Sequence, residues 1–255
     1  MRTEVPVSGG FVTVYASSPL GEPRGRCLVG APFGLPASAL AIVERHLVDA
    51  GFSVMRFDPR DHVGAGSGEM ADYRISTVTE DCSELIDLLQ PTCVLAISMG
   101  AKAALRALAD GEHHADAVLV TPVVSVRDTL RAILGADWFA VDHGEVPDPM
   151  LVLDHEIRAV QFRRDCELHG LVDLEGTIVD LLATPGRVRV VAGSHDPWVD
   201  RHAVRRALSL IEGRGRMTVV PAVTHLLHLD PDLAVRMIDA AVEQIIDLHA
   251  ARPPG

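Results

Sequence analysis

The chain has 255 residues, of which 48% are hydrophobic and 23% are charged. This balance suits one globular α/β domain with an insertion, and it excludes a disordered or fibrous protein. The formal net charge is −12 and the sequence offers no basic patch, so a nucleic-acid partner is not expected.

Residues 1–8 contain no basic stretch followed by an apolar one, and no run approaches the ~18 apolar residues that cross a bilayer. We therefore expect a cytoplasmic protein with no membrane span. The twelve histidines lack the spacing of a metalloprotease motif, so no metal or cofactor is expected. The cysteines also lack metal-ligand spacing and are expected to be reduced core thiols: Cys27, Cys82, Cys93 and Cys166.

The first half of the chain alternates strands with helices. Strands are expected at residues 11–16, 26–31, 52–57 and 117–120, and helices at 75–89 and at 38–50, the latter with Ser38 as its cap. This alternation indicates a mostly parallel sheet. The loop at 58–69 is rich in glycine, but it does not open a helix as a dinucleotide-binding motif does.

Residues 92–111 read as a short apolar run, one serine between small residues, and an Ala/Leu-rich helix. The centre of this segment, Ala96-Ile97-Ser98-Met99-Gly100, is typical of a nucleophile elbow. The turn of an elbow is so tight that only small residues fit two positions before and two after the serine. Ser98 is therefore the candidate nucleophile, and the alternative is an ordinary strand, turn and helix with a solvated serine.

Between Pro122 and Pro185 the alternation gives way to several short amphipathic helical patterns separated by glycine and proline. An insertion at this point would arch over the carboxyl ends of the strands as a cap. Its apolar residues could line an acyl-chain pocket, and the candidates are Leu130, Ile133, Leu134, Trp138, Phe139, Val141, Leu151, Leu153 and Phe162. The alternative is that they only pack the cap onto the body, as apolar stripes at helical spacing normally do.

Two later strands lead into candidate catalytic residues. A buried strand pattern at 188–193 is followed by Asp196, and a second at 217–221 is followed by His225. The chain order serine, aspartate, histidine is that of α/β-hydrolases, in which the acid orients the histidine that serves as base. His228 is a rival base, but His225 directly follows the strand-end loop.

Two main-chain N–H groups are expected to hold the oxyanion of such a reaction. One belongs to Met99, the residue after the candidate nucleophile. The other comes from the loop at residues 30–34, where Pro32 has no N–H and Phe33 is the expected donor.

These patterns predict an α/β-hydrolase fold with a mostly parallel central sheet flanked by helices. Residues 1–121 and 186–255 are expected to form this core. Residues 122–185 are expected to form a helical cap, inserted after the strand near residue 120.

Four segments carry a more specific likeness: Arg56-Phe-Asp-Pro-Arg-Asp-His-Val-Gly-Ala-Gly-Ser-Gly-Glu69, Val124-Ser-Val-Arg-Asp-Thr-Leu130, Phe162-Arg-Arg-Asp-Cys-Glu167 and Asp196-Pro-Trp-Val199. They resemble the acyl transferase family of bacterial bioluminescence, the myristoyl-ACP thioesterases, and the likeness extends over about residues 25 to 230. The resemblance implies an enzyme that takes an acyl group from acyl carrier protein (ACP) or CoA onto Ser98. It also implies His225 as base and Asp196 as orienting acid.

The leading hypothesis is therefore a serine acyl-thioester hydrolase or acyltransferase that acts on a fatty or polyketide-like chain carried by ACP or CoA. One alternative keeps the fold and the three residues but acts on oxygen esters, as carboxylesterases and lipases do. A second alternative is a non-catalytic binding protein of the same fold. Arg127 and Arg131 could contact a pantetheine phosphate, or could simply pair with Asp128.

Overall fold

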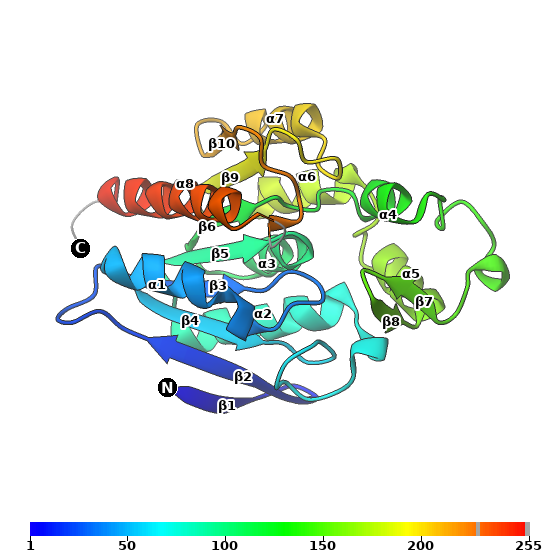
Figure 1. The fold of residues 1–255 in the computed structure, drawn as a ribbon, viewed down its shortest axis with the longest axis horizontal. Helices are drawn as coiled ribbons and strands as arrows, with labels where there is room; N and C mark the ends of the chain where they lie inside the picture. Colours follow the sequence, from blue (N-terminus) through cyan, green and yellow to red (C-terminus); the bar gives the residue numbers. More distant parts are fainter. Residues whose placement is uncertain (228–229, 253–255) are drawn as a thin grey trace.

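The computed structural model describes residues 1–227 and 230–252 and has an eight-stranded sheet at its centre (Figure 1). Its strands are β1 (Arg2–Val7), β2 (Gly10–Ser17), β3 (Arg26–Gly30), β4 (Ser53–Asp58), β5 (Cys93–Ile97), β6 (Asp116–Val120), β9 (Val188–Gly193) and β10 (Gly215–Val220). They lie in the order β1-β2-β4-β3-β5-β6-β9-β10. The six strands from β4 to β10 in this order run parallel, and β1 and β2 extend one edge in antiparallel fashion.

Helices cover both faces of the sheet. They are α1 (Ala41–Asp49), α2 (Ile75–Leu89), α3 (Met99–Asp110), α4 (Val126–Leu134), α5 (Ala159–Leu168), α6 (Leu174–Ala183), α7 (Arg201–Ser209) and α8 (Pro231–Ala250), with short 3-10 turns η1 (Ala37–Leu40), η2 (Met70–Asp72) and η3 (His143–Glu145). α1 and α8 pack on one face, and α2 and α3 on the other. In β5, Leu95 packs on the side of α1 and α8, whereas Val94 and Ala96 pack on the side of α2 and α3. All five residues of the strand are buried. This is how a central parallel strand covered on both sides is built.

The expected core elements are present, with ends shifted by one or two residues. The helix expected at 38–50 is the exception, because it begins as η1 and becomes α-helical only at Ala41. Ser38 does not cap it. The buried carboxylate of Asp58, at the end of β4, accepts the N–H of Ala37 at 2.6 Å instead. Strand β1 was not expected, because its mostly exposed residues show no buried pattern.

Residues 122–185 connect β6 to β9 and contain α4, α5 and α6, together with a hairpin that was not expected. The hairpin pairs β7 (Met150–Val152) with β8 (His155–Ile157) across a two-residue turn. The turn residues Leu153 and Asp154 both have positive φ angles, 47° and 66°. Figure 1 shows α4, α5 and the hairpin beyond the carboxyl end of β5, whereas α6 packs against α3. The segment therefore contributes both to the region above the strand ends and to the layer of helices beside the sheet.

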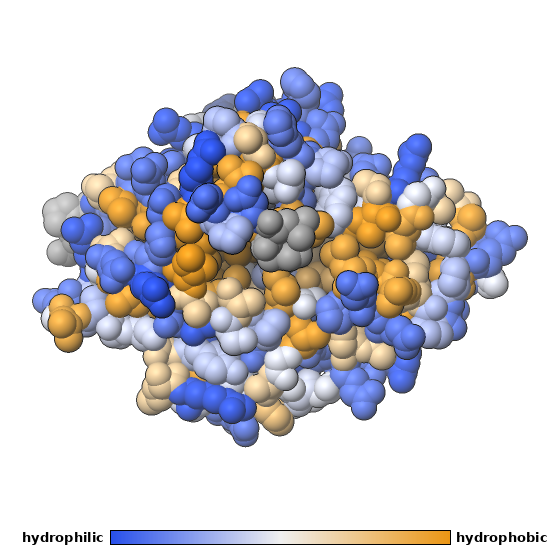
Figure 2. Space-filling model, viewed as in Figure 1, coloured by the Kyte–Doolittle hydropathy of each residue, from blue (hydrophilic) through white to orange (hydrophobic). Residues whose placement is uncertain are grey.

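Apolar side chains reach the surface near the hairpin. Figure 2 shows a hydrophobic area over the part of the molecule where α4 and the hairpin lie. Leu151 and Leu153 of the hairpin are among the exposed hydrophobic residues. The described part of the chain holds no helix that is both long and apolar enough to cross a membrane. All four cysteines are buried and free, which confirms their expected place in the core.

Candidate active site

The turn between β5 and α3 has the geometry of a nucleophile elbow. Ser98 adopts φ 54° and ψ −120°, a backbone conformation that residues other than glycine rarely adopt. Contacts with the rest of the fold must therefore hold it. Its N–H donates to the carbonyl of Val120 at 2.9 Å, and its carbonyl accepts the N–H of Val123 at 3.1 Å. Gly100 lies so close to the loop after β3 that a Cβ would collide with the carbonyl oxygen of Ala31. The small residue expected there is thus required by the close approach of two backbone segments.

Ser98, His225 and Asp196 form a continuous series of hydrogen bonds. The Oγ of Ser98 lies 2.7 Å from Nε2 of His225, and Nδ1 of His225 lies 2.9 Å from Oδ2 of Asp196. His225 is 7% exposed and Asp196 is 8% exposed. Because a carboxylate oxygen accepts, Nδ1 carries the hydrogen and Nε2 is free to accept from the serine hydroxyl. The three residues are brought together from the loops after β5, β9 and β10, as the sequence predicted.

Trp198 holds the acid from a second side. Its main-chain N–H donates to Oδ1 of Asp196 at 2.9 Å, and the centroid of its indole ring lies 4.4 Å from that of the His225 imidazole. Both oxygens of the carboxylate are therefore engaged, which fixes its direction toward the imidazole. The neighbouring His195 is exposed and takes no part in the series. The rival base His228 lies outside the residues that the structure describes.

A mainly apolar pocket opens beside Ser98. Its walls come from the core, from α4, from the hairpin and from α5: Phe33, Ser98, Met99, Val123, Thr129, Leu130, Ile133, Val152, Leu153, Ile157, Phe162 and Trp198. Concave apolar sites with a few polar groups are the usual form of small-ligand sites. Met99 and Phe33 are both in this lining. Met99 also opens α3, where first-turn N–H groups have no acceptor within the helix.

Of the candidate substrate-binding residues in this segment, Leu130 and Phe162 line the pocket, whereas Leu134, Trp138 and Phe139 do not. These three pack against the core from positions that are partly buried. The carbonyls of Trp138 and Phe139 accept hydrogen bonds from the guanidinium of Arg163. These bonds hold residues 138 and 139 against α5, which carries Arg163.

Several lining residues were missed. Val152 and Ile157 belong to the hairpin, whose strands alternate buried and exposed positions in the structure, whereas the sequence at residues 150–153 is uniformly apolar and gives no such alternation. Trp198 could have been suspected from its place two residues after Asp196. Ile133 and Leu153, which the sequence also offered as candidates, are in the lining.

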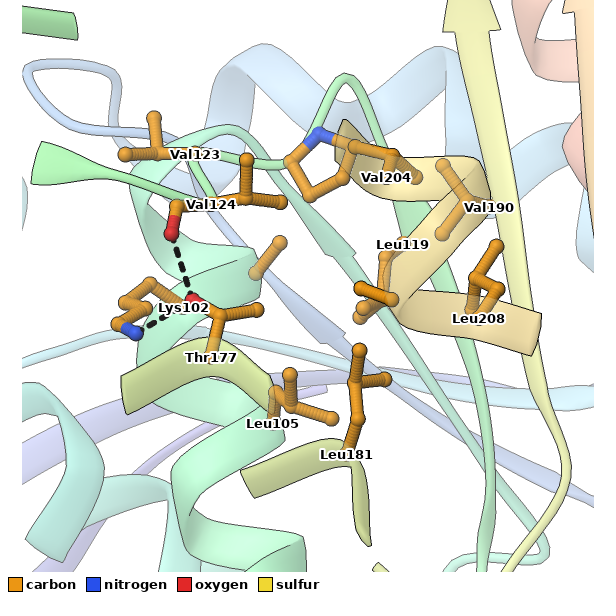
Figure 3. A pocket seen from close by; sticks show the side chains of 13 residues that line it. Lys102, Leu105, Leu119, Val123, Val124, Thr177, Leu181, Val190, Val204 and Leu208 are labelled. Carbon is orange, nitrogen blue, oxygen red and sulfur yellow. Dashed lines mark hydrogen bonds between the residues drawn. The ribbon is translucent and has the colours of Figure 1, made fainter. Parts of the chain in front are cut away.

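A second pocket is lined by residues of α3, α6 and α7 and of strands β6 and β9, and its lining does not include Ser98 (Figure 3). The side chain of Lys102 is buried there, and its Nζ donates to Oγ1 of Thr177 at 2.6 Å. Thr177 in turn donates to the carbonyl of Val124 at 2.7 Å, and the carboxylate of Asp180 lies 3.7 Å from Nζ. Burial lowers the pKa of Lys102 to about 8, against the opposing effect of Asp180. This network joins α6 to α3.

Arg127 is engaged on the surface. Its guanidinium donates to both oxygens of Asp137, from Nε to Oδ1 at 3.1 Å and from Nη2 to Oδ2 at 2.7 Å, and not to Asp128. This bidentate pair raises the pKa of the Arg127 guanidinium and lowers the pKa of the Asp137 carboxyl. Of the two alternatives offered for Arg127, the pairing with Asp128 is not formed, because the loop after α4 brings Asp137 to its guanidinium.

Solved structures identify the class of fold. Est1E from Butyrivibrio proteoclasticus, solved with ferulic acid bound, gives a TM-score of 0.79 at 16% identity and covers 97% of this chain and 99% of that one. A monoacylglycerol lipase from Paleococcus ferrophilus gives 0.67 at 18% identity, with 92% and 99% covered. At these identities the likeness concerns the fold alone, and the fold is that of the α/β-hydrolases, as the sequence predicted.

Sequence comparison narrows this class to one family. Residues 26–228 match the acyl transferase family model, and the chain belongs to that family. Relatives named acyl transferase include one from Photorhabdus luminescens, 27% identical over 193 residues, and one from Vibrio harveyi, 27% identical over 191 residues. The matches cover 74% and 72% of this chain but 62% of each relative. The resemblance to the luminescent-bacterial acyl transferases is confirmed.

Proposed function

We propose that this protein is a serine acyltransferase or hydrolase that removes a fatty or polyketide-like acyl chain from the thioester of ACP or CoA. The observation that carries the proposal is the hydrogen-bonded series Ser98–His225–Asp196 at the edge of an apolar pocket. Membership of the acyl transferase family supports an acyl donor as substrate. The reaction needs no metal or cofactor, because the three side chains supply the nucleophile, the base and the acid that orients it.

In the first half-reaction, Oγ of Ser98 attacks the thioester carbonyl carbon while Nε2 of His225 takes the hydroxyl proton. The carbonyl oxygen becomes an oxyanion, which the N–H groups of Met99 and Phe33 would stabilise. The intermediate collapses by breaking the carbon–sulfur bond. The thiolate leaves with the proton from His225, and an acyl ester remains on Ser98.

In the second half-reaction, water or an alcohol attacks the acyl ester. His225 takes a proton from the incoming oxygen and returns it to Oγ of Ser98 as the ester bond breaks. The products are a free acid or a new ester, together with the regenerated serine. Asp196 keeps the imidazole in the tautomer that both steps need, and it stabilises the imidazolium formed in each.

Residues 122–185 would act as a cap that receives the acyl chain. Leu130, Ile133 and Phe162 present apolar surface to the pocket from α4 and α5, and Leu153 does so from the hairpin. Burying an acyl chain against such walls is favourable by about 0.8 kcal/mol per methylene. The cap would therefore bind the chain while the core carries out the chemistry.

Mass spectrometry of the intact protein tests this proposal. Wild type and Ser98→Ala are exposed briefly to acyl-CoA and acyl-ACP donors of several chain lengths, and released thiol is followed in parallel. We expect an acyl mass on the wild type only, and peptide mapping to place it on Ser98. p-Nitrophenyl esters of the same acyl chains are run beside the thioesters.

Each result decides between the hypotheses. Turnover of the oxygen esters without thiol release would favour a carboxylesterase or lipase. Folded wild type that neither turns over a donor nor is labelled by a fluorophosphonate would favour a binding protein.

A further inference from the structure

Two histidines hold the loop that carries the second oxyanion donor. The N–H of Gly34 donates to Nε2 of His62 at 3.2 Å, and the carbonyl of Gly34 lies 3.1 Å from Nε2 of His155. Both polar groups of one residue are thus bound by side chains from distant parts of the chain. His62 belongs to the loop after β4, and His155 begins β8 in the hairpin.

The fit at this loop is close. Gly34 has φ +77°, and a Cβ placed on it would lie 2.7 Å from Nε2 of His155, so only glycine is accommodated. The ring of the preceding residue, Phe33, packs edge-on against His62 and His155, with centroid distances of 6.5 and 5.9 Å. It also packs edge-on against Tyr73 at 4.9 Å. The orientation of Phe33 therefore depends on its contacts with these three side chains.

The hydrogen bonds of His62 define a single neutral form. Nδ1 lies 3.1 Å from the carbonyl of Val63, which can only accept, so Nδ1 carries a hydrogen. Nε2 receives the N–H of Gly34, so Nε2 carries none. Adding a proton to Nε2 would set two N–H groups against each other. Protonation of His62 is therefore incompatible with its bond to Gly34.

The surroundings of His62 favour this neutral form. The side chain is 6% exposed, and burial lowers its pKa. Two charged or titratable groups act on it, Asp58 of β4, which favours the charged imidazolium, and His155 of β8, which opposes it. Tyr73 also faces it, with a centroid distance of 5.6 Å, and burial raises the pKa of that phenol so that it stays neutral.

We propose that His62 and His155 are positioning residues that direct the N–H of Phe33 toward the oxyanion, and that His62 does so only while uncharged. This inference rests on the proposed function. The N–H of Phe33 lies on the peptide that joins Pro32 to Phe33, and the carbonyl of that peptide accepts the N–H of Leu35 at 3.3 Å. The two bonds to Gly34 hold the next two peptides of the same turn, so the geometry ties the orientation of the Phe33 N–H to the two histidines. His155 donates from Nε2 in either protonation state, so the acid sensitivity belongs to His62.

The proposal has a kinetic signature that a purely structural role would not give. Loss of one oxyanion donor costs about 10²–10³ in kcat. The wild type should lose kcat/KM with the uptake of two protons in acid, one on His225 and one on His62. A variant with a non-titrating acceptor at position 62 should lose it with the uptake of one.

The experiment compares His62→Gln, His62→Leu and wild type, with His114→Gln as a matched control at an exposed position. Thiol release and p-nitrophenyl ester cleavage are followed from about pH 4 to about pH 8, because burial lowers the pKa of His62 below the usual histidine range. Folding is checked by circular dichroism at each pH. We expect His62→Gln to keep most of its activity at neutral pH, because its amide oxygen can accept from Gly34. The limiting slope of log kcat/KM against pH in acid should be two for the wild type and one for His62→Gln.

His62→Leu has no acceptor, and it should lose about 10²-fold in kcat with little change in KM. Its rate of labelling by a fluorophosphonate should fall in parallel. Unchanged kcat in folded His62→Leu, or a two-proton slope in His62→Gln, would overturn the inference and leave the proposed function standing. If wild-type protein releases no thiol but cleaves esters, only the thioester substrate is wrong, and the same comparison is read on the esters. If wild type is inert to donors, esters and fluorophosphonate alike, both proposals fail.

Discussion

The sheet with its helices, here called the core, and the segment 122–185 between β6 and β9 line the same pocket by different means. In the core, Ser98, Asp196 and His225 each stand in the loop after a parallel strand, and the sheet brings these loops together. In the segment, apolar side chains from α4, the hairpin and α5 converge on one pocket without sharing any local motif. The comparison teaches that the position of a reactive group follows from the strand it ends, whereas the shape of a pocket follows from long-range packing.

The largest effect expected from this comparison is in the core. Asp196→Asn should lower turnover by about 10⁴-fold, because an amide cannot keep the imidazole of His225 in the required tautomer. The loss should be equal for short and long acyl donors, since the residue does not line the pocket. Single-turnover thiol release over a chain-length series measures it, with His195→Gln as the exposed neighbouring control. A loss that varied strongly with chain length would break the division between core and segment.

This division also explains what could be predicted from the sequence. The elbow, the acid and the histidine were readable because each depends on a strand pattern and a few adjacent residues. The pocket was readable only in part. Leu130 and Leu134 have the same side chain on the same helix, but α4 ends at Leu134 and Gly135 turns the chain in the left-handed conformation. Only contacts with the rest of the molecule distinguish the two leucines.

The next largest effect tests the segment. Ile133 and Leu134 are adjacent on α4 and both are half-buried, but only Ile133 lines the pocket. Ile133→Ala should change the preference between long and short acyl donors by about 10-fold, because a hydrophobic pocket discriminates by ~1–3 kcal/mol per methylene. Leu134→Ala should leave that preference unchanged, whatever it does to stability. Ratios of kcat/KM over the chain-length series measure both, and equal shifts in the two variants would contradict the pocket as drawn.

A smaller effect concerns the junction between the two regions, where Lys102 of α3 meets Thr177 and Asp180 of α6 (Figure 3). The pKa of Lys102 is about 8 in the folded protein against an ordinary value of 10.5, so the unfolded chain binds this proton more tightly. Below pH 8 the buried charge of Lys102 destabilises the folded protein to its full extent. This destabilisation is relieved as the pH rises from 8 toward 10.5, the ordinary pKa of lysine. Relative to Lys102→Met, wild type should therefore gain stability between these values, by at most ~1.4 kcal/mol per pH unit.

Urea unfolding of wild type and Lys102→Met at neutral and alkaline pH measures this difference. In the variant, Asp180 keeps its ion pair with Arg106 at 2.5 Å, so no buried carboxylate loses its partner entirely. Thr177 can still donate to Val124. A stability difference that does not depend on pH would mean that Asp180 fully offsets the effect of burial on the Lys102 ammonium. In that case the polar network would hold α6 to α3 without a net cost of burying the charge.

The smallest effect is expected at the surface of α4. A phosphate clamp would need free guanidinium groups, but Arg127 already donates to both oxygens of Asp137. Exposed pairs of this kind contribute little and are screened by salt. Replacing Arg127 and Arg131 together by glutamine should therefore leave the KM for acyl-CoA within about twofold of wild type. A tenfold rise in KM for acyl-CoA but not for a p-nitrophenyl ester would show that the segment recognises the phosphate of the carrier as well as the acyl chain. The segment would then contribute a polar contact as well as apolar walls, and its contrast with the core would be weaker.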